Sequence, residues 1–509
     1  MRFASASEIY ALDAAARAAA WCAPGADRSG ALMRVAARAL ADRVRAVAAL
    51  LPVRPAVAAF CGPGDNGRDA ALALELLARD GFETFPFSVP GSFDPAMPPC
   101  TLSSPAVALD GLLGIGAKGA PREPAAAAIR WLNAARRAAA PGALRVIAVD
   151  LPSGLAPDAS SVAPDTLAVE ADETLSMGLP KRVFAAPGAI AFTGEIRVAD
   201  IGYPASAYAG PDDPDLSTPP AGAAGVPVSS LFAERDLALA RPPRAWDAHK
   251  GDFGRVALFA GSDRYPGAAL LAALGALRGG AALVQAFVPR RLVPAFAARA
   301  PEAVFGGWEG GALSCTALAA SAPDLRGAVV AAGPGFSRAP ETAGAVRWLL
   351  SSPGAAGFVL DADALFALGQ LPRSGGGAVA PAPCILTPHP GEAARLLGVA
   401  AADVQADRAG AVRALADRSG ATVLLKGAGT LVTSPGEPPT LVAAGSPALA
   451  KGGSGDILCG LCASLLARGL APRDAACVAA LLHGRAAVAA SLARSQDAFV
   501  PTDLLPFLA

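Results

Sequence analysis

A glycine-rich stretch, Gly445-Ser-Pro-Ala-Leu-Ala-Lys-Gly-Gly-Ser-Gly-Asp456, runs into an apolar segment of helical period from Ile457 to Arg468. Glycines just before a helix expose backbone N–H groups where the helix dipole favours anions, so the stretch predicts a cradle for phosphate. Asp456 at the helix start can take the proton from an attacking hydroxyl. An ordinary turn capped by Asp456 is the alternative, and only companion motifs can decide between the two. With those motifs, the stretch predicts nucleotide-dependent phosphoryl transfer with Asp456 as catalytic base.

The companion motifs lie in other loops of the same half. Thr387-Pro-His-Pro-Gly-Glu392 follows an apolar strand, and its prolines fix the backbone, so the His389 imidazole is aimed rather than mobile. Further Gly-rich loops stand beside predicted strands: Leu424–Thr430 with Lys426, Val330–Gly335, and His249–Gly254. His483 lies in a helix-like segment and is interpreted as structural. These loops favour a nucleotide site over a simple helix cap.

Short apolar runs that end in Gly or Asp alternate with Ala-rich helical segments along the whole chain. The runs are Val57–Phe60, Val146–Val149, Val256–Phe259 and Phe358–Leu360. This alternation predicts parallel α/β sheets whose ligands sit at the carboxyl ends of the strands. A chain of 509 residues is too long for one ordinary domain. The Pro-rich region after Tyr203 indicates a linker, so we predict domains at 1–205 and 229–509, joined by 206–228.

Composition narrows the classes of partner. Acidic and basic residues balance at 43 each, which argues against nucleic acid and against an anionic membrane, and favours small molecules. The apolar runs lack the ~20 uninterrupted residues of a spanning helix, and the N-terminus lacks a signal core, so we expect a soluble, cytoplasmic protein. Cys459 and Cys462 form a lone CxxC pair, which we interpret as buried small residues rather than a zinc or redox site.

The ordered motifs of the C-terminal half carry a family resemblance. His249-Lys-Gly-Asp-Phe-Gly-Arg255, the segment 260–280, Ala331-Ala-Gly-Pro-Gly335, Leu386–Gly398, Leu424–Thr430, Gly452–Asp456 and Leu481–Gly484 stand in this order. Together they resemble the ribokinase-like ATP- or ADP-dependent NAD(P)H-hydrate dehydratases over nearly all of 245–490. No Walker-type P-loop is present in the sequence, as a ribokinase-like site implies.

The resemblance implies a repair reaction on NADH or NADPH hydrated at nicotinamide carbon 6. The hydroxyl is phosphorylated and then eliminated, with ADP or ATP as co-substrate together with Mg²⁺, and with ADP preferred in bacterial-type members. The implied substrate contacts are Ala269, Gly335, His389 and Asp456. The implied nucleotide contacts are Lys426, Gly427, Ala428, Gly429, Thr430 and Gly455. The sequence departs from the family pattern at Lys451, usually Thr, and at Ser446, usually Asn; Lys451 either alters nucleotide preference or points to solvent.

The N-terminal half has its own set of strand-end loops. Phe60-Cys-Gly-Pro-Gly-Asp-Asn-Gly-Arg-Asp69 lies between a predicted strand and a helix, and Asp110–Gly116 and Val149–Gly154 follow two more strands. Oxygen-rich loops that converge at one sheet edge are suited to a cation and a phosphate-bearing ligand.

These loops resemble the NAD(P)H-hydrate epimerase domain, a Rossmann-like three-layer α/β/α fold, over about 1–205. The implied activity interconverts the R and S hydrates, with Asp150 as the catalytic carboxylate. Asn66, Asp110 and Ser153 would coordinate K⁺. The hydrated dinucleotide would contact Asp65, Asn66, Gly67, Arg68, Asp69, Gly114, Ile115, Gly116, Ala117, Lys118, Gly119, Ala120 and Asp150. The family also implies a homo-oligomer.

Three departures from the family loop leave an alternative open. Asp65 replaces an Asn, and Arg68 and Ala70 replace glycines. A side chain at 68 would interfere if that position needs positive φ or close ligand approach, whereas Arg68 can instead pair with a substrate phosphate or with Asp65. Domain one is therefore either an active epimerase or a non-catalytic binding module. For domain two, a ribokinase-like vitamin or sugar kinase is the rival function.

Overall fold

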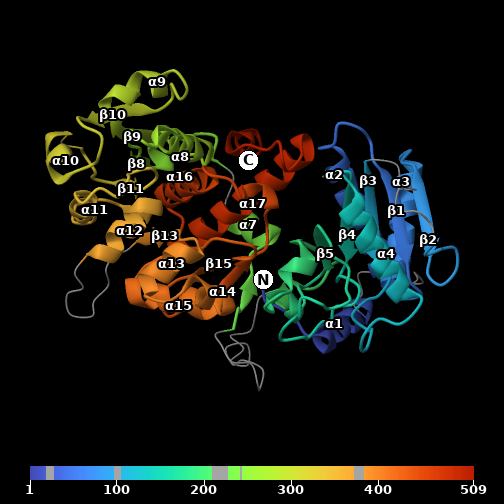
Figure 1. Cartoon of the computed structure of the whole chain (residues 1–509). Coiled ribbons are helices and arrows are strands. Elements are labelled where there is room, and N and C mark those ends of the chain that lie inside the picture. Colours follow the sequence, from blue (N-terminus) through green and yellow to red (C-terminus); the bar gives the residue numbers. More distant parts are fainter. Residues whose placement is uncertain are drawn as a thin grey trace. The chain divides into compact units, whose positions relative to one another are not determined.

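The computed structural model describes residues 1–18, 28–96, 105–140, 142–208, 227–240, 244–321, 323–371 and 383–508. The chain forms two compact units (Figure 1). The first comprises Met1–Ala223, Ser229–Glu234 and Ser491–Ala498, and the second comprises Ala224–Val228, Arg235–Ala490 and Phe499–Ala509. Most of the predicted linker, 209–226, lies outside the described residues.

The first unit is built on a parallel sheet of six strands in the order β2-β1-β3-β4-β5-β6. The strands are β1 (Ala56–Cys61), β2 (Thr84–Ser88), β3 (Ala106–Gly111), β4 (Leu144–Val149), β5 (Glu173–Met177) and β6 (Glu195–Ala199). Phe60 of β1 pairs with Asp110 of β3, which pairs with Ala148 of β4. The loops after these three strands therefore start at one edge of the sheet.

Helices cover both faces of this sheet. The helical segments of the unit are α1 (Ala6–Ala18), α2 (Arg28–Ala48), α3 (Asp65–Arg79), α4 (Ala125–Ala138), η2 (Arg182–Ala185), α5 (Ile190–Thr193) and α6 (Ala205–Tyr208), and a short strand, β7, spans Ser230–Leu231. Side chains alternate between faces along each strand. Val57 packs in one core with residues of α2 and α3, whereas Phe60 packs in a second core, where its ring lies 5.5 Å from that of Trp131 on α4. The predicted three-layer α/β/α arrangement is confirmed.

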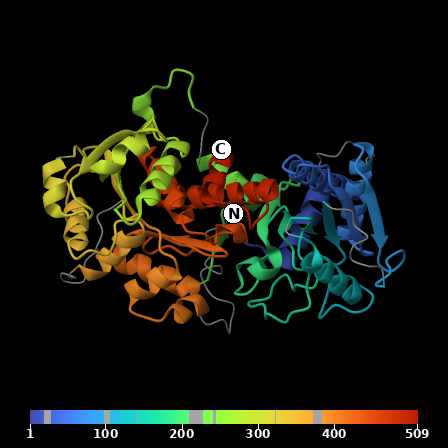
Figure 2. The same ribbon diagram turned by 45° about the horizontal axis from the view of Figure 1, so that its top comes forward.

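The second unit has a larger sheet in the order β10-β9-β8-β11-β12-β13-β14-β15-β16. Its strands are β8 (Arg255–Phe259), β9 (Leu283–Pro289), β10 (Val304–Trp308), β11 (Ala328–Ala332), β12 (Gly357–Leu360), β13 (Cys384–Leu386), β14 (Thr422–Leu425), β15 (Thr430–Thr433) and β16 (Thr440–Val442). The strands from β10 to β14 are parallel, and β15 and β16 continue the sheet antiparallel. In Figure 2 the yellow and orange strands of this sheet lie among the helices of the unit.

Helices of the second unit bring the predicted site loops together. They are α7 (Glu234–Ala240), η3 (Lys250–Phe253), α8 (Pro266–Arg278), η4 (Arg290–Leu292), α9 (Val293–Ala297), α10 (Cys315–Ser321), α11 (Thr342–Leu350), α12 (Ala362–Gln370), α13 (Pro390–Leu397), α14 (Ala401–Ala406), α15 (Arg408–Ser419), η5 (Pro447–Leu449), α16 (Ser454–Ala467), α17 (Pro472–Arg494) and η6 (Pro501–Phe507). The glycines of α8 and α16 let the two backbones approach closely (Figure 1): a Cβ on Gly460 would lie 2.0 Å from the Ala272 carbonyl oxygen. This packing fixes the start of α16 against α8.

The α/β class and the two-domain architecture are confirmed, and each predicted strand lies within an observed one. One detail differs, because α16 begins at Ser454 rather than Ile457, so Gly455 and Asp456 belong to its first turn. Among the described residues, α17 is the one helix long and apolar enough to cross a membrane by length and composition. However, 83% of its most apolar window is buried inside the protein, as in the core helices of globular domains.

Candidate active sites

Asp150 lies in the first unit directly after β4, at the sheet edge where the predicted loops meet. Its φ of 69° falls in the left-handed region, which Asp tolerates better than most residues. The carboxylate Oδ1 accepts a hydrogen bond of 2.8 Å from the Met177 amide and contacts the ammonium group of Lys181. Asp150 is 7% exposed and Lys181 is completely buried, so the pair holds the carboxyl group in a fixed orientation.

Sequence reasoning missed Lys181. The Lys181 Nζ also donates to Ser176 Oγ at 3.1 Å and to the carbonyl oxygens of Leu179 and Met177 at 3.2 and 3.3 Å. A lysine is almost never fully buried unless it is paired. The available signal was a Lys in the short loop, residues 178–181, that follows strand β5.

Asn66 ties the first turn of α3 to the neighbouring strand ends. Its side-chain amide donates to the Val149 carbonyl oxygen at 2.7 Å and to the Leu113 carbonyl oxygen at 3.3 Å. Its Oδ1 faces Gly114, where a Cβ would lie 2.8 Å away. The structure thus brings the three predicted loops together around Asn66.

Asp110 and Ser153, two of the predicted potassium ligands, are buried side by side. Ser153 donates to Asp110 through its Oγ, at 2.6 Å, and through its backbone amide, at 2.8 Å. Among the described residues, no basic side chain forms an ion pair with Asp110, and burial raises the pKa of its carboxyl to about 6. A completely buried carboxylate without a counter-ion, beside amide and hydroxyl oxygens, fits a hard cation such as K⁺.

Arg68 does not distort the loop. It lies within α3, its φ is not positive, and its side chain is 63% exposed and pairs with Asp65 at 3.2 Å. A side chain at this position therefore meets no conflict with the backbone angle, and in this structure it pairs with Asp65. Gly67, in contrast, leaves no room for a side chain, because a Cβ there would lie 2.0 Å from the Gly62 carbonyl oxygen.

The remaining predicted substrate contacts of this unit differ in exposure. Asp69 is 8% exposed, whereas Lys118, Gly119 and Ala120 are exposed. Gly114, Ile115 and Ala117 are half-buried, and a Cβ on the exposed Gly116 would lie 2.8 Å from the Tyr10 hydroxyl oxygen. The segment 114–120 therefore leads from the buried carboxylates to the surface.

In the second unit, Asp456 lies in the first turn of α16. Burial, together with the negative charge of Asp361, raises the pKa of its carboxyl to about 7, against the opposing effect of Lys426. A carboxyl that titrates near neutral pH is well matched to proton transfer at that pH.

The half-buried Lys426 and the buried Asp361 form an ion pair beside this turn. The Lys426 Nζ donates to Asp361 Oδ1 at 2.8 Å and lies 3.9 Å from a carboxylate oxygen of Glu392. A Cβ on Gly455 would lie 3.4 Å from the Lys426 Nζ, which places two predicted nucleotide contacts together. Asp361 was noted in the sequence only as the end of a strand, and its role as the partner of Lys426 was missed.

The Gly-rich turn at Gly427–Thr430 joins β14 to β15. Gly427 and Gly429 have φ values of 138° and 65°, which explains why glycine is needed at both positions. Arg408, from the start of α15, donates to the carbonyl oxygens of Leu425, Lys426 and Gly429 at 3.3–3.4 Å. Sequence reasoning did not identify this arginine, because it is distant in the sequence from the turn that it supports.

The predicted substrate contacts of the second unit come from three elements. His389 is the N-cap of α13, its Nδ1 accepts from the Gly391 amide at 3.0 Å, and more than half of its side chain is exposed. Gly335 follows β11 with a φ of 66°, and a Cβ there would lie 2.7 Å from the Tyr265 carbonyl oxygen. Ala269 is completely buried on α8. The prolines around His389 therefore start a helix that aims the imidazole, as predicted.

Other residues singled out in the sequence have structural roles. His483 is buried on α17, its Nε2 lies 2.9 Å from the Ser454 carbonyl oxygen, and burial lowers its pKa to about 4, so the imidazole is neutral. Lys451 donates to the Phe499 carbonyl oxygen, and the Ser446 hydroxyl accepts from the Ala448 amide. Cys459 and Cys462 are completely buried thiols on α16, as expected.

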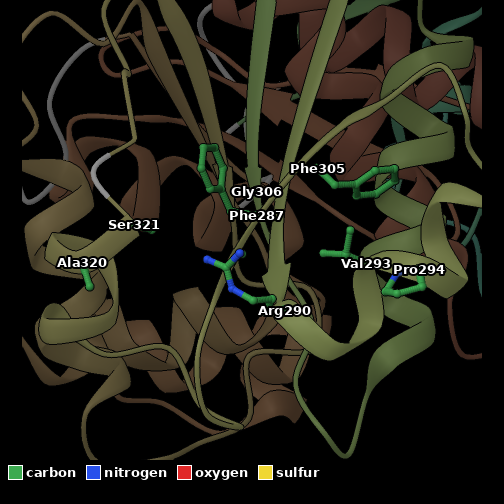
Figure 3. Close-up of a pocket in the computed structure, with 9 residues that line it drawn as sticks. Phe287, Arg290, Val293, Pro294, Phe305, Gly306, Ala320 and Ser321 are labelled. Atoms are coloured by element: carbon green, nitrogen blue, oxygen red, sulfur yellow. The ribbon is translucent and has the colours of Figure 1, made fainter.

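A cavity of about 440 Å³ lies elsewhere in the second unit. In Figure 3 the Arg290 side chain points toward the side of Phe287 and away from Val293 and Pro294. The cavity is lined by Phe287, Arg290, Val293, Pro294, Phe305, Gly306, Gly307, Ala320 and Ser321. None of these residues belongs to either predicted site.

Comparisons with known proteins find matches in both units of the chain. Residues 256–508 match the family model described as NAD(P)H-hydrate dehydratase, and residues 86–183 match the model described as YjeF-related protein N-terminus. The bifunctional NAD(P)H-hydrate repair enzyme Nnr of Moorella thermoacetica is 34% identical over 485 residues, covering 88% of this chain and 86% of the relative. The chain belongs to the family of bifunctional NAD(P)H-hydrate repair enzymes.

Other members and neighbours of this repair family extend the comparison. The Nnr protein of Gloeobacter violaceus is 36% identical and covers 89% of both chains. The ADP-dependent (S)-NAD(P)H-hydrate dehydratase of Neisseria meningitidis is 41% identical over 244 residues, which is 48% of this chain and 79% of the relative. The ADP/ATP-dependent dehydratase of Bacillus subtilis, crystallised with ATP/Mg²⁺, superposes with a TM-score of 0.47 at 31% identity, covering 55% of this chain and 96% of that one.

Proposed function

We propose that this protein repairs hydrated NADH and NADPH in two steps, epimerisation in the first unit and nucleotide-driven dehydration of the S hydrate in the second. The proposal is supported mainly by family membership: relatives that match most of the chain are named bifunctional NAD(P)H-hydrate repair enzymes. In each unit, a carboxylate at the carboxyl edge of a parallel sheet supplies the acid–base group that its reaction needs. We assign the epimerase to 1–205 and the dehydratase to 229–509.

In the first unit, Asp150 is the proposed catalytic carboxylate. Lys181 and the Met177 amide hold its Oδ1, so Oδ2 is the oxygen available to the substrate. Asp65–Asp69 and Gly114–Ala120 form the proposed substrate contacts. The substrate phosphates would lie near the surface part of these segments, where Lys118 and Arg68 are exposed.

Potassium would be held in the same unit by Asn66, Asp110 and Ser153. When bound, it supplies a fixed positive charge that balances Asp110 and stabilises the loop around the substrate. Two hydrogen bonds, from Asn66 to Val149 and from Ser153 to Asp110, hold the proposed potassium ligands in place.

In the second unit, Asp456 is the proposed base that removes the proton from the C6 hydroxyl as it attacks the terminal phosphate of the nucleotide. Phosphorylation turns a poor leaving group into phosphate, which then departs with its electron pair as the C5 proton is lost and the ring double bond reforms. In this proposal, Lys426 and the first-turn amides of α16 would stabilise the charge that develops on the phosphate. His389, Gly335 and Ala269 are the proposed substrate contacts.

We infer that ADP is the nucleotide, since the Neisseria meningitidis relative is named as ADP-dependent. Lys426–Thr430 and Gly455 form its proposed site. Among the described residues, no cluster of His, Cys, Asp and Glu side chains could hold a metal ion alone. This agrees with a Mg²⁺ that arrives on the nucleotide and keeps mostly phosphate and water ligands.

The rival functions are separable by experiment. Purified S and R hydrates of NADH are supplied separately, with ADP or ATP, and the recovery of NADH absorbance is followed. Recovery of NADH from the S hydrate in the presence of nucleotide supports the dehydratase. If no NADH is recovered and the protein instead phosphorylates a vitamin or sugar, the second unit is a kinase.

The R hydrate tests the first unit. Consumption of the R hydrate supports the epimerase, whereas an R hydrate that persists would make the first unit a binding module. We further propose a cytoplasmic, homo-oligomeric enzyme, which fractionation and light scattering would check.

A further inference from the structure

Asp69 is a buried carboxylate close to Asp150 whose role the proposed mechanism leaves open. It lies on α3 three residues after Asn66, so the two side chains share one face of the helix. Asn66 donates to the carbonyl oxygen of Val149, the residue directly before Asp150. The face of α3 that carries Asp69 is therefore turned toward the catalytic end of β4.

The Asp69 carboxyl group is buried, yet among the described residues one of its oxygens lacks the hydrogen-bond partner that a buried structural carboxyl normally has. It is 8% exposed, and its buried Oδ1 has no hydrogen-bond partner in the described part of the chain. Burial, together with the negative charges of Asp150, Asp65 and Asp13, raises the pKa of its carboxyl to about 8. Burying a carboxyl without a partner destabilises the fold, and such sites cluster where function requires them.

The other acidic residues nearby are already engaged. Asp65 is 63% exposed and pairs with Arg68, and Asp13 accepts a 2.5 Å hydrogen bond from the Tyr203 hydroxyl. Asp150 is paired with the buried Lys181. The charged groups that act on Asp69 are thus the three carboxylates of Asp150, Asp65 and Asp13, and among these described carboxyls Asp69 alone lacks a partner at a buried oxygen.

We propose that Asp69 is a second catalytic residue of the epimerase, the acid that protonates the departing C6 hydroxyl while Asp150 is the base for the incoming water. The inference rests on the proposed epimerase function and adds a residue role to it. Epimerisation at C6 inverts one carbon, so the leaving and entering oxygens use opposite faces of the ring. Two carboxyls, one protonated and one ionised, meet that requirement.

Epimerisation in this proposal proceeds by loss and re-addition of water at C6. The Asp69 proton moves to the C6 hydroxyl, the C6–O bond breaks, and the ring nitrogen lone pair forms an N1=C6 double bond as water leaves. A water molecule then adds to C6 from the other face, and its proton goes to Asp150. The product is the opposite epimer, and the enzyme is left with Asp69 ionised and Asp150 protonated. In this state the enzyme is ready for the reverse reaction. Water is lost and regained without a change of oxidation state, so no oxidant or reductant is needed.

The test uses the full chain with Asp69→Asn, Asp69→Glu and, as a matched control, Glu75→Gln, an exposed carboxyl on the same helix. Epimerisation of purified R hydrate is measured, together with incorporation of ¹⁸O from labelled water into the C6 hydroxyl. We expect Asp69→Asn to lower kcat for both by roughly 10²-fold or more, with KM changed little. Asp69→Glu should restore part of the rate, and Glu75→Gln should match the wild type.

A pH profile separates this role from a merely structural one. The wild-type rate should fall as the pH rises through about 8, where Asp69 loses its proton, and the residual rate of Asp69→Asn should lack that alkaline limb. Dehydration of pure S hydrate by the second unit, with circular dichroism, reports whether each variant is folded. Folded Asp69→Asn with near-wild-type epimerisation, or with an unchanged alkaline limb, would overturn the role of Asp69. Failure of the wild type to epimerise would instead remove the proposed function itself.

Discussion

The ammonium group of Lys181 contacts Oδ1 of Asp150 in the interior of the first unit, where the lysine is completely buried. Opposite charges held together without water interact more strongly than at a surface, but each depends on the other, since a buried charge alone is costly. The pair therefore links the chemistry of the proposed epimerase to the stability of the domain.

Replacing Lys181 by Met should destabilise the first unit by about 3 kcal/mol, because the variant leaves Asp150 buried without its counter-ion. Adding Asp150→Asn to the same chain should recover much of this loss. Asn also tolerates the left-handed backbone at that position, so the charge is the main change. Chemical denaturation of both single variants and the double variant measures the coupling; strictly additive losses would show that the two side chains do not interact.

The dehydration rate should depend on the ionisation of Asp456. A base acts in its ionised form, so kcat/KM for the S hydrate should be highest above pH 7 and fall as the pH drops through about 7, where the carboxyl becomes protonated. Asp456→Asn should lower kcat by roughly 10²–10⁴-fold while nucleotide binding, measured by calorimetry, persists. Near-normal turnover in that variant would refute the assignment.

Asp361→Asn should move the acidic limb of that profile to lower pH. The variant removes the negative charge that raises the pKa of Asp456, and it also leaves Lys426 without its closest partner. Asp363→Asn is the matched control, because Asp363 raises the same pKa less. If both variants shift the acidic limb of the pH profile equally, or if neither variant shifts it, the Asp361 charge does not control the pKa of Asp456.

Gly455→Ala should weaken nucleotide binding while the fold stays intact. The added Cβ would lie 3.4 Å from the Lys426 Nζ, an ordinary contact for the protein, yet it would stand where we place the nucleotide. Gly452→Ala is the comparison variant, because a Cβ there meets no atom within 4 Å. A larger Kd for ADP in Gly455→Ala than in Gly452→Ala, at matched thermal stability, is the expected result; equal affinities would exclude this part of the site.

Much of the fold could be predicted from local patterns. The runs at Val57–Phe60 and Val256–Phe259 are short, apolar and followed by Gly-rich turns, so strand identity and the functional edge of each sheet were evident. The start of α16 was placed too late, because glycine disfavours helices in general, while here Gly455 occupies a first turn whose amides need no intrahelical acceptor.

The partners within the sites were harder to predict. Lys181, Asp361 and Arg408 each act through a residue that lies 18 to 65 positions away in the sequence, and no local spacing indicates such a contact. The effect of Arg68 was also open in the sequence, since it depends on a backbone angle that only the folded helix fixes.

Arg408 gives the Gly-rich turn a support from outside its own sequence, through hydrogen bonds to three of its carbonyl oxygens. The segment Leu424–Thr430 is therefore not a self-contained module that can be transplanted as a short peptide. A protein engineer who moves it into another scaffold must bring the start of α15 along with it.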